Sequence, residues 1–125
     1  MYRRYNANPS GKLTNDCTVR AISKVTGKSW RGVFAGLSEI SYEQYDMPSS
    51  NAIWGTYMRR EGYTRHTIPD RCPDCYTAKD FCNDHPYGTY LLGTGTHVIA
   101  VINGDYYDTW DSGNELPVYY WEKEA

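Results

Sequence analysis

A cysteine and a histidine, far apart in the chain, are the first candidates for chemistry. Cys17 lies at the expected start of a helix, and His97 precedes a run of β-branched residues. The unpaired N–H groups and the dipole at a helix N-terminus favour a thiolate, which is the reactive form of cysteine. A histidine at the edge of a buried strand can take up and return a proton. We therefore expect a thiolate–imidazolium pair in which Cys17 is the nucleophile and His97 is the general base.

Two carboxylates are candidates for orienting the imidazole of His97. The pair Asn103-Gly104 is a strong hairpin signal, and Asp108 follows it on the expected return strand, near the level of His97. A carboxylate there can accept the imidazole N–H and fix its tautomer. Asp111 is the alternative, although the Ser-Gly pair after it equally suits a turn.

The other three cysteines offer a competing, metal-binding chemistry. Cys72 and Cys75 form a CxxC pair, and Cys82 forms a CxxH pair with His85. Three cysteines and one histidine suit a tetrahedral structural zinc, with His66 as an alternative fourth ligand. Such a zinc would order the loop and stabilise the fold. The same segment also suits a short helix in which Cys82 faces the core, so both interpretations stay open.

Helical periodicity, which must position Cys17, is strongest in the first half of the chain. Asn15 or Asp16 can cap the first helix, and Gly27 ends it. Residues 41–49 look like a loop. The expected helices cover approximately residues 15–27, 29–40, 50–62 and 77–84.

The strands that must position His97 and Asp108 are expected in the second half. The run from His97 to Asn103 is typical of a buried strand, and residues 1–14 look like a polar arm or loop. Helices followed by strands indicate a single α+β domain over residues 1–125, with N-terminal helices packed against a C-terminal antiparallel sheet. The expected strands cover residues 63–68, 89–92, 97–103, 106–110 and 118–121.

Composition excludes several classes of function. The chain has 125 residues, a formal net charge of −2 and no long basic run, which argues against nucleic-acid binding through phosphates. No apolar stretch resembles a signal peptide or reaches the length of a membrane span. We therefore expect a cytoplasmic protein with reduced thiols and no membrane partner. The 13 tyrosines and 4 tryptophans can fill a core or line a groove.

Three segments together carry a family resemblance. Residues 15–22 read Asn-Asp-Cys-Thr-Val-Arg-Ala-Ile, residues 95–104 contain His97, and residues 107–112 contain Asp108. They resemble the nucleophile helix, the histidine strand and the acidic strand of small papain-like cysteine peptidases from phages and bacteria. These proteins are distantly similar to the double-glycine leader peptidases of bacteriocin exporters. The resemblance implies a papain-like fold and a triad of nucleophile, base and orienter at Cys17, His97 and Asp108.

The resemblance also implies an oxyanion hole, made by the backbone N–H of Cys17 and an upstream side-chain amide. Papain-like enzymes usually place a glutamine several residues before the cysteine, but the only glutamine here is Gln44. Asn15 is the nearest upstream amide, with Asn8 and Asn6 further back. Losing one oxyanion donor can cost roughly a hundredfold to a thousandfold in rate. This departure therefore bears on turnover more than on the fold.

The expected function is that of a thiol-dependent hydrolase, a cysteine peptidase or amidase that works through a thioester and needs no cofactor. Its substrate would be a peptide or protein, and the same thioester also permits acyl transfer. One alternative is a papain-like binding module, encoded by a phage, that has lost turnover and holds a host protein in an aromatic groove. Another is a zinc-stabilised interaction domain in which Cys17 is incidental.

Overall fold

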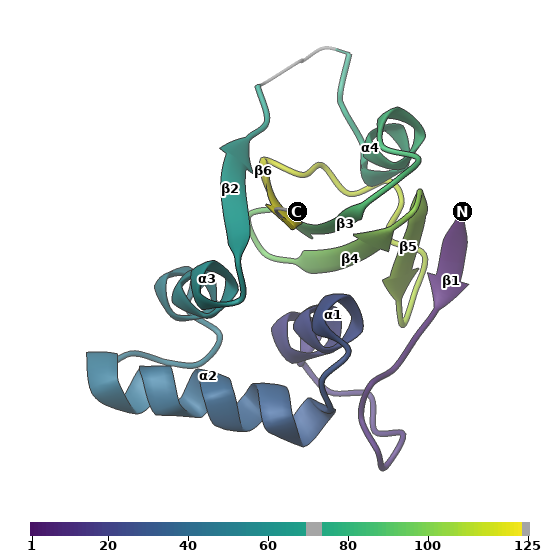
Figure 1. Cartoon of the computed structure of the whole chain (residues 1–125). Helices are drawn as coiled ribbons and strands as arrows, with labels where there is room; N and C mark the ends of the chain where they lie inside the picture. The colour runs from purple at the N-terminus through teal and green to yellow at the C-terminus, as the bar shows by residue number, and fades with distance from the viewer. Residues whose placement is uncertain (70–73, 124–125) are drawn as a thin grey trace.

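A six-stranded sheet lies at the centre of the computed structural model, which describes residues 1–69 and 74–123 (Figure 1). Within these residues the chain is α+β, as predicted. The strands in spatial order are β1 (Tyr2–Arg4), β5 (Asp105–Asp108), β4 (Val98–Ile102), β3 (Thr89–Gly93), β6 (Tyr119–Lys123) and β2 (Tyr63–Thr67).

Helices cover both faces of the sheet. All four predicted helices are present, as α1 (Cys17–Thr26), α2 (Trp30–Gln44), α3 (Asn51–Arg60) and α4 (Ala78–Asp84). Helices α1, α2 and α3 lie on one side, and α4 lies on the other (Figure 1). Helix α2 extends four residues into the predicted loop 41–49. The residue after its last turn is the C-cap Tyr45, which takes a left-handed conformation and donates its N–H to Ser41 O.

The sheet separates two apolar cores. On one face, Ile22 of α1 packs with side chains that include Leu91 and Ala100 of the central strands. On the other face, Phe81 of α4 packs with side chains that include Ile99 and Val101. The β-branched run of β4 serves both cores because successive residues of a strand point to opposite faces. The buried central strand predicted from this run is therefore confirmed.

The prediction of a purely antiparallel sheet is wrong at one edge. Residues 2–4, expected within a polar arm, form β1 and pair in parallel with β5, with Arg4 opposite Asp108. Beyond β1, the N–H of Tyr5 donates to Asp108 O at 2.8 Å. The sheet is therefore mixed. The sequence carries little signal for β1, because a three-residue edge strand is held by backbone bonds rather than by an alternating apolar pattern.

The predicted hairpin at Asn103-Gly104 is confirmed. Both residues have positive φ, 50° and 79°, and Ile102 pairs with Asp105 across the turn. Two central residues with positive φ define the tight hairpin turn that asparagine followed by glycine favours. The turn sets β5 against β4, and β5 ends at Asp108, two residues earlier than predicted. No helix among residues 1–69 and 74–123 is both long and apolar enough to cross a membrane.

Candidate active site

Cys17 is the first residue of α1, and its side chain is half-buried. Of the two predicted cap positions, Asn15 and Asp16, the N-cap residue is Asp16, but its carboxylate accepts no hydrogen bond from the helix N–H groups. The first N–H groups of a helix have no partner within the helix. The start of α1 therefore presents unpaired N–H groups and the positive end of the helix dipole beside the sulfur.

A hydroxyl in the loop between β3 and β4 holds the backbone of His97. Thr94 Oγ1 accepts the N–H groups of Thr96 and His97 at 3.1 and 2.8 Å, and Thr94 N donates to His97 O at 2.9 Å. The ring of Trp110 lies against the imidazole, with the ring centres 5.2 Å apart. These contacts fix His97 just before β4, and 11% of its side chain is exposed.

The thiol of Cys17 and the imidazole of His97 form an interacting pair. Burial by itself would raise the pKa of Cys17, but a hydrogen bond with His97 and its charge lower that pKa below its ordinary value. The backbone N–H of Val98 and the side chain of Thr18 lower it further. Burial would lower the pKa of His97, but Asp108 and Cys17 raise it to about 9. Opposite shifts of this kind favour a thiolate beside an imidazolium.

Asp108 completes a hydrogen-bonded row with His97 and Cys17. Its carboxylate is fully buried, and its Oδ2 lies 2.6 Å from His97 Nε2 and 2.8 Å from Ser112 Oγ. Burial would raise the pKa of Asp108, but hydrogen bonds from His97, Ser112 and the Thr109 backbone lower it. Because Nε2 faces Asp108, the other ring nitrogen is left for Cys17. The structure thus brings together the three residues that sequence spacing singled out.

Sequence reasoning missed a second half of this network, which lies on α1 and α2. Arg20 is buried and bridges two carboxylates, with Nη1 2.6 Å from Asp16 Oδ1 and Nη2 2.8 Å from Asp108 Oδ1. The indole N–H of Trp30 donates to Asp16 Oδ2 at 2.9 Å. The available signal was the spacing of Asp16 and Arg20, since residues i and i+4 of a helix face each other.

The remaining predicted site residues lie apart from the imidazole. Asp111 accepts hydrogen bonds from the Tyr106 hydroxyl and the Gly113 N–H, so the carboxylate that meets His97 is that of Asp108 rather than Asp111. Asn15 is exposed and lies on the rim of the pocket that holds Cys17. Its role as an oxyanion donor stays a prediction.

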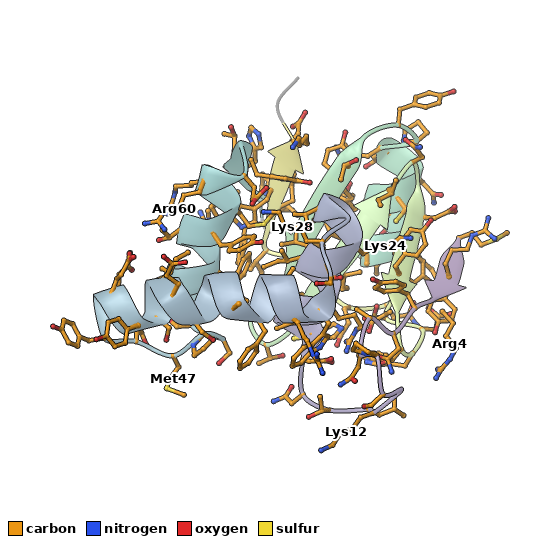
Figure 2. All side chains as sticks on the ribbon, turned by 60° about the horizontal axis from the view of Figure 1, so that its bottom comes forward. Arg4, Lys12, Lys24, Lys28, Met47 and Arg60 are labelled. Carbon is orange, nitrogen blue, oxygen red and sulfur yellow. The ribbon has the colours of Figure 1, made fainter. Side chains whose placement is uncertain are left out.

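A pocket of about 660 Å³ opens over Cys17 and His97. One wall is apolar, and in it the rings of Trp30 and Phe34 stack at 5.2 Å. Polar residues of the N-terminal loop also line the pocket. Lys12 and Met47 both line the pocket and project from the same side of the molecule (Figure 2). The other apolar lining residues include Pro48, Trp54, Val98 and Tyr119.

The predicted zinc ligands show other contacts. Cys72 lies outside the described residues. Cys82 of α4 is buried in the core on that helix's face of the sheet, and burial raises the pKa of its thiol to about 11. His85 stacks on Phe81 at 3.9 Å, with Nδ1 2.9 Å from Phe81 O. His66 stacks on Tyr120 and lies 3.4 Å from Glu122 Oε2.

Across residues 1–69 and 74–123, no three His, Cys, Asp or Glu side chains group closely enough to hold a metal. Cys75, the remaining predicted ligand, is exposed. The zinc site stays a prediction, and zinc analysis of the purified full chain tests it. About one equivalent of zinc would support it, and less than about half an equivalent would count against it.

Comparison with known proteins leaves the relationship of this chain open. No family model, no curated protein and no solved structure matches it. The papain-like relationship inferred from the sequence therefore stays a proposal.

Proposed function

We propose that this chain is a papain-like thiol hydrolase, a cysteine peptidase or amidase, in which Cys17 attacks an acyl carbon. The supporting observation is the row of hydrogen bonds from the Cys17 thiol through His97 to the buried carboxylate of Asp108. A lone cysteine at a helix start often serves only as a core residue. The imidazole beside it and the buried carboxylate behind that imidazole are what favour the catalytic interpretation.

The chemistry follows from the two protonation states. The thiolate of Cys17 attacks the carbonyl carbon, and the tetrahedral oxyanion collapses as the imidazolium of His97 gives its proton to the leaving nitrogen. The products of this first half of the reaction are a free amine and a thioester on Cys17. Neutral His97 then takes a proton from water, the hydroxide attacks the thioester, and the carboxylic acid leaves as the thiolate and imidazolium are restored. Asp108 keeps the ring in one orientation throughout.

Unpaired N–H groups at the start of α1 support an oxyanion site beside the thiolate. The backbone N–H of Cys17 is the first donor, and Asn15 on the pocket rim is the side-chain amide that we propose as the second. No cofactor is needed for these steps.

The pocket walls support a peptide or protein substrate with a large apolar side chain close to the attacked bond. The stacked rings of Trp30 and Phe34 face the pocket, and Phe34 and Met47 are 45% and 68% exposed. Exposed apolar side chains beside a nucleophile gain from burial against a substrate. We further propose that the chain works in the cytoplasm, where Cys17 stays reduced.

The alternative is a binding module that keeps the pocket but has lost turnover. It is favoured by the lack of an upstream glutamine, since Gln44 ends α2 and Asn15 is exposed. In this alternative the apolar wall binds a partner protein, and Cys17 catalyses no reaction.

Alkylation of Cys17 tests the proposal. Iodoacetamide labelling at a series of pH values, followed by peptide mass spectrometry, reports the thiolate fraction of each cysteine. We expect Cys17 to reach half of its maximal rate well below the ordinary thiol pKa of about 8.5, and His97→Ala to move that midpoint upward. The same series on the urea-unfolded chain, in which every thiol should titrate normally, is the control.

Two results separate the alternatives. If Cys17 titrates like an ordinary thiol and His97→Ala does not change its midpoint, both the enzyme and the thiolate–imidazolium pair are ruled out. A lowered titration with no cleavage of apolar peptide or amide substrates, and no difference between the full chain and Cys17→Ser, would favour the binding module.

A further inference from the structure

Arg20 holds a buried guanidinium on α1 between two carboxylates. Only 5% of the residue is exposed, and its two terminal nitrogens donate to different partners, Nη1 to Asp16 at 2.6 Å and Nη2 to Asp108 at 2.8 Å. This division needs the rigid fork of arginine, because a lysine presents its donors at a single nitrogen. A buried charge with this geometry fixes the position of whatever it binds.

The carboxylate of Asp108 has its acceptor sites filled. Oδ2 accepts from His97 and Ser112, and Oδ1 accepts from Arg20 and the Thr109 N–H, with all four distances between 2.6 and 2.8 Å. A carboxylate offers about four such sites. Arg20 is the charged donor on the oxygen that does not face His97. It therefore opposes rotation of the carboxylate away from the imidazole.

The outer end of this network reaches the pocket. Asp16 Oδ1 accepts from Arg20, and Asp16 Oδ2 accepts from the indole N–H of Trp30 at 2.9 Å. Trp30 also lines the pocket with its ring stacked on Phe34. Hydrogen bonds therefore run without a break from the pocket wall to the imidazole of His97.

We infer that Arg20 is a positioning residue, which holds the Asp108 carboxylate against His97, while Asp16 and Trp30 hold Arg20 from the pocket wall. The functional value of this positioning rests on the proposed function, because the orientation of His97 matters to a reaction only if Cys17 is the nucleophile. The positioning itself is measurable without any turnover.

A charge-balanced double substitution separates positioning from simple electrostatics. Loss of Arg20 alone would remove a positive charge and so favour the imidazolium of His97. Asp16→Asn with Arg20→Met removes one charge of each sign, so the net charge of the site stays the same. Methionine has similar length and suits a buried position, and the amide oxygen introduced by Asp16→Asn would still accept the indole N–H.

The readout is the pKa of His97, followed by NMR of the imidazole in protein labelled at histidine. We expect the double variant to lower this pKa by about one unit or more, which is at least a tenfold loss of proton affinity. The midpoint of Cys17 alkylation should rise in the same protein. The matched control is Glu43→Gln with Arg60→Gln, which removes an exposed ion pair of 3.7 Å from α2 and α3 and should leave both values unchanged.

An unchanged or raised pKa of His97 in the double variant would overturn the positioning role. Trp30→Phe is the second variant if the double variant does not fold, since it keeps a pocket-facing ring and removes only the indole N–H. It should lower the pKa of His97 in the same direction by a smaller amount, and an unmoved value there would equally overturn the inference. An ordinary Cys17 titration in the unsubstituted chain would instead overturn the proposed function.

Discussion

At the scale of single residues, the carboxylate of Asp108 is the point where three parts of the chain meet. Its donors come from α1, from the loop before β4 and from the segment after β5. Because the group is fully buried, the loss of any one donor would leave a carboxylate oxygen with fewer hydrogen bonds and no water to replace them. The network therefore favours one arrangement of these segments over others.

The raised pKa of His97 predicts a dependence of stability on pH. A histidine with a pKa of about 9 in the folded chain and about 6.5 in the unfolded chain stabilises the fold by its bound proton. This stabilisation is complete below about pH 6.5 and is lost as the pH rises through about 9. The background Cys17→Ala removes the opposing titration of the thiol together with the part of the raised pKa that Cys17 causes, and it keeps the part that Asp108 causes.

In that background, we expect the free energy of unfolding to fall by about 1–2 kcal/mol between pH 6 and pH 9.5, relative to the double variant Cys17→Ala/His97→Gln. Urea unfolding at the two pH values measures the difference. Parallel pH curves for the two proteins would show that His97 gains no proton affinity on folding.

Residue types and spacing predicted the part of the site that can do chemistry, but not the part that supports it. Cys17, His97 and Asp108 each follow a local signal, a helix start or a strand end. The role of Arg20 was not predicted because a charged residue on a helix usually faces solvent. Only the tertiary contact between α1 and β5 shows that this arginine is buried.

At the scale of elements, local signals predicted structure well where they were strong. The capping box of α4, with Thr77 and Asp80 bonded reciprocally, and the turn at Asn103-Gly104 both depend on neighbours in the sequence. The end of α2 and the strand β1 were misjudged. Helix α2 has no glycine at its C-terminal end to mark where it stops. Strand β1 pairs with residues more than a hundred positions away.

The end of α2 allows a prediction about stability. Tyr45 has a φ of 56°, a conformation that costs a residue with a side chain about 1 kcal/mol, and it is 97% exposed. Tyr45→Gly should therefore raise the free energy of unfolding by about 0.5–1 kcal/mol. Tyr42→Gly is the matched control, because this 86% exposed tyrosine lies within the helix and its loss to glycine should be destabilising. Equal effects of the two changes in denaturant unfolding would refute the explanation.

At the scale of the whole molecule, the sheet divides the two apolar cores, and the site belongs to the side of α1. Phe81 of α4 is 1% exposed and packs on the other side against strand residues that include Ile99 and Val101. Phe81→Leu should lower the free energy of unfolding by about 1–2 kcal/mol through lost packing. The midpoint of Cys17 alkylation should stay where it is.

Thermal or urea unfolding and the same alkylation series check both parts of this prediction. Ile22→Val, on the α1 side, should cost about 1 kcal/mol and serves as the comparison of similar size. A change in the midpoint of Cys17 alkylation in Phe81→Leu would contradict the separation of the two layers.

The distance along the chain between Arg20 and Asp108, 88 positions, has a consequence for biosynthesis. A ribosome makes the helix with Cys17 before it makes the strands that bring the imidazole and the carboxylate. Contacts between such distant segments form only after the later one has emerged. During translation the thiol therefore lacks the imidazole that lowers its pKa, and it gains this partner only when β4 and β5 join the sheet.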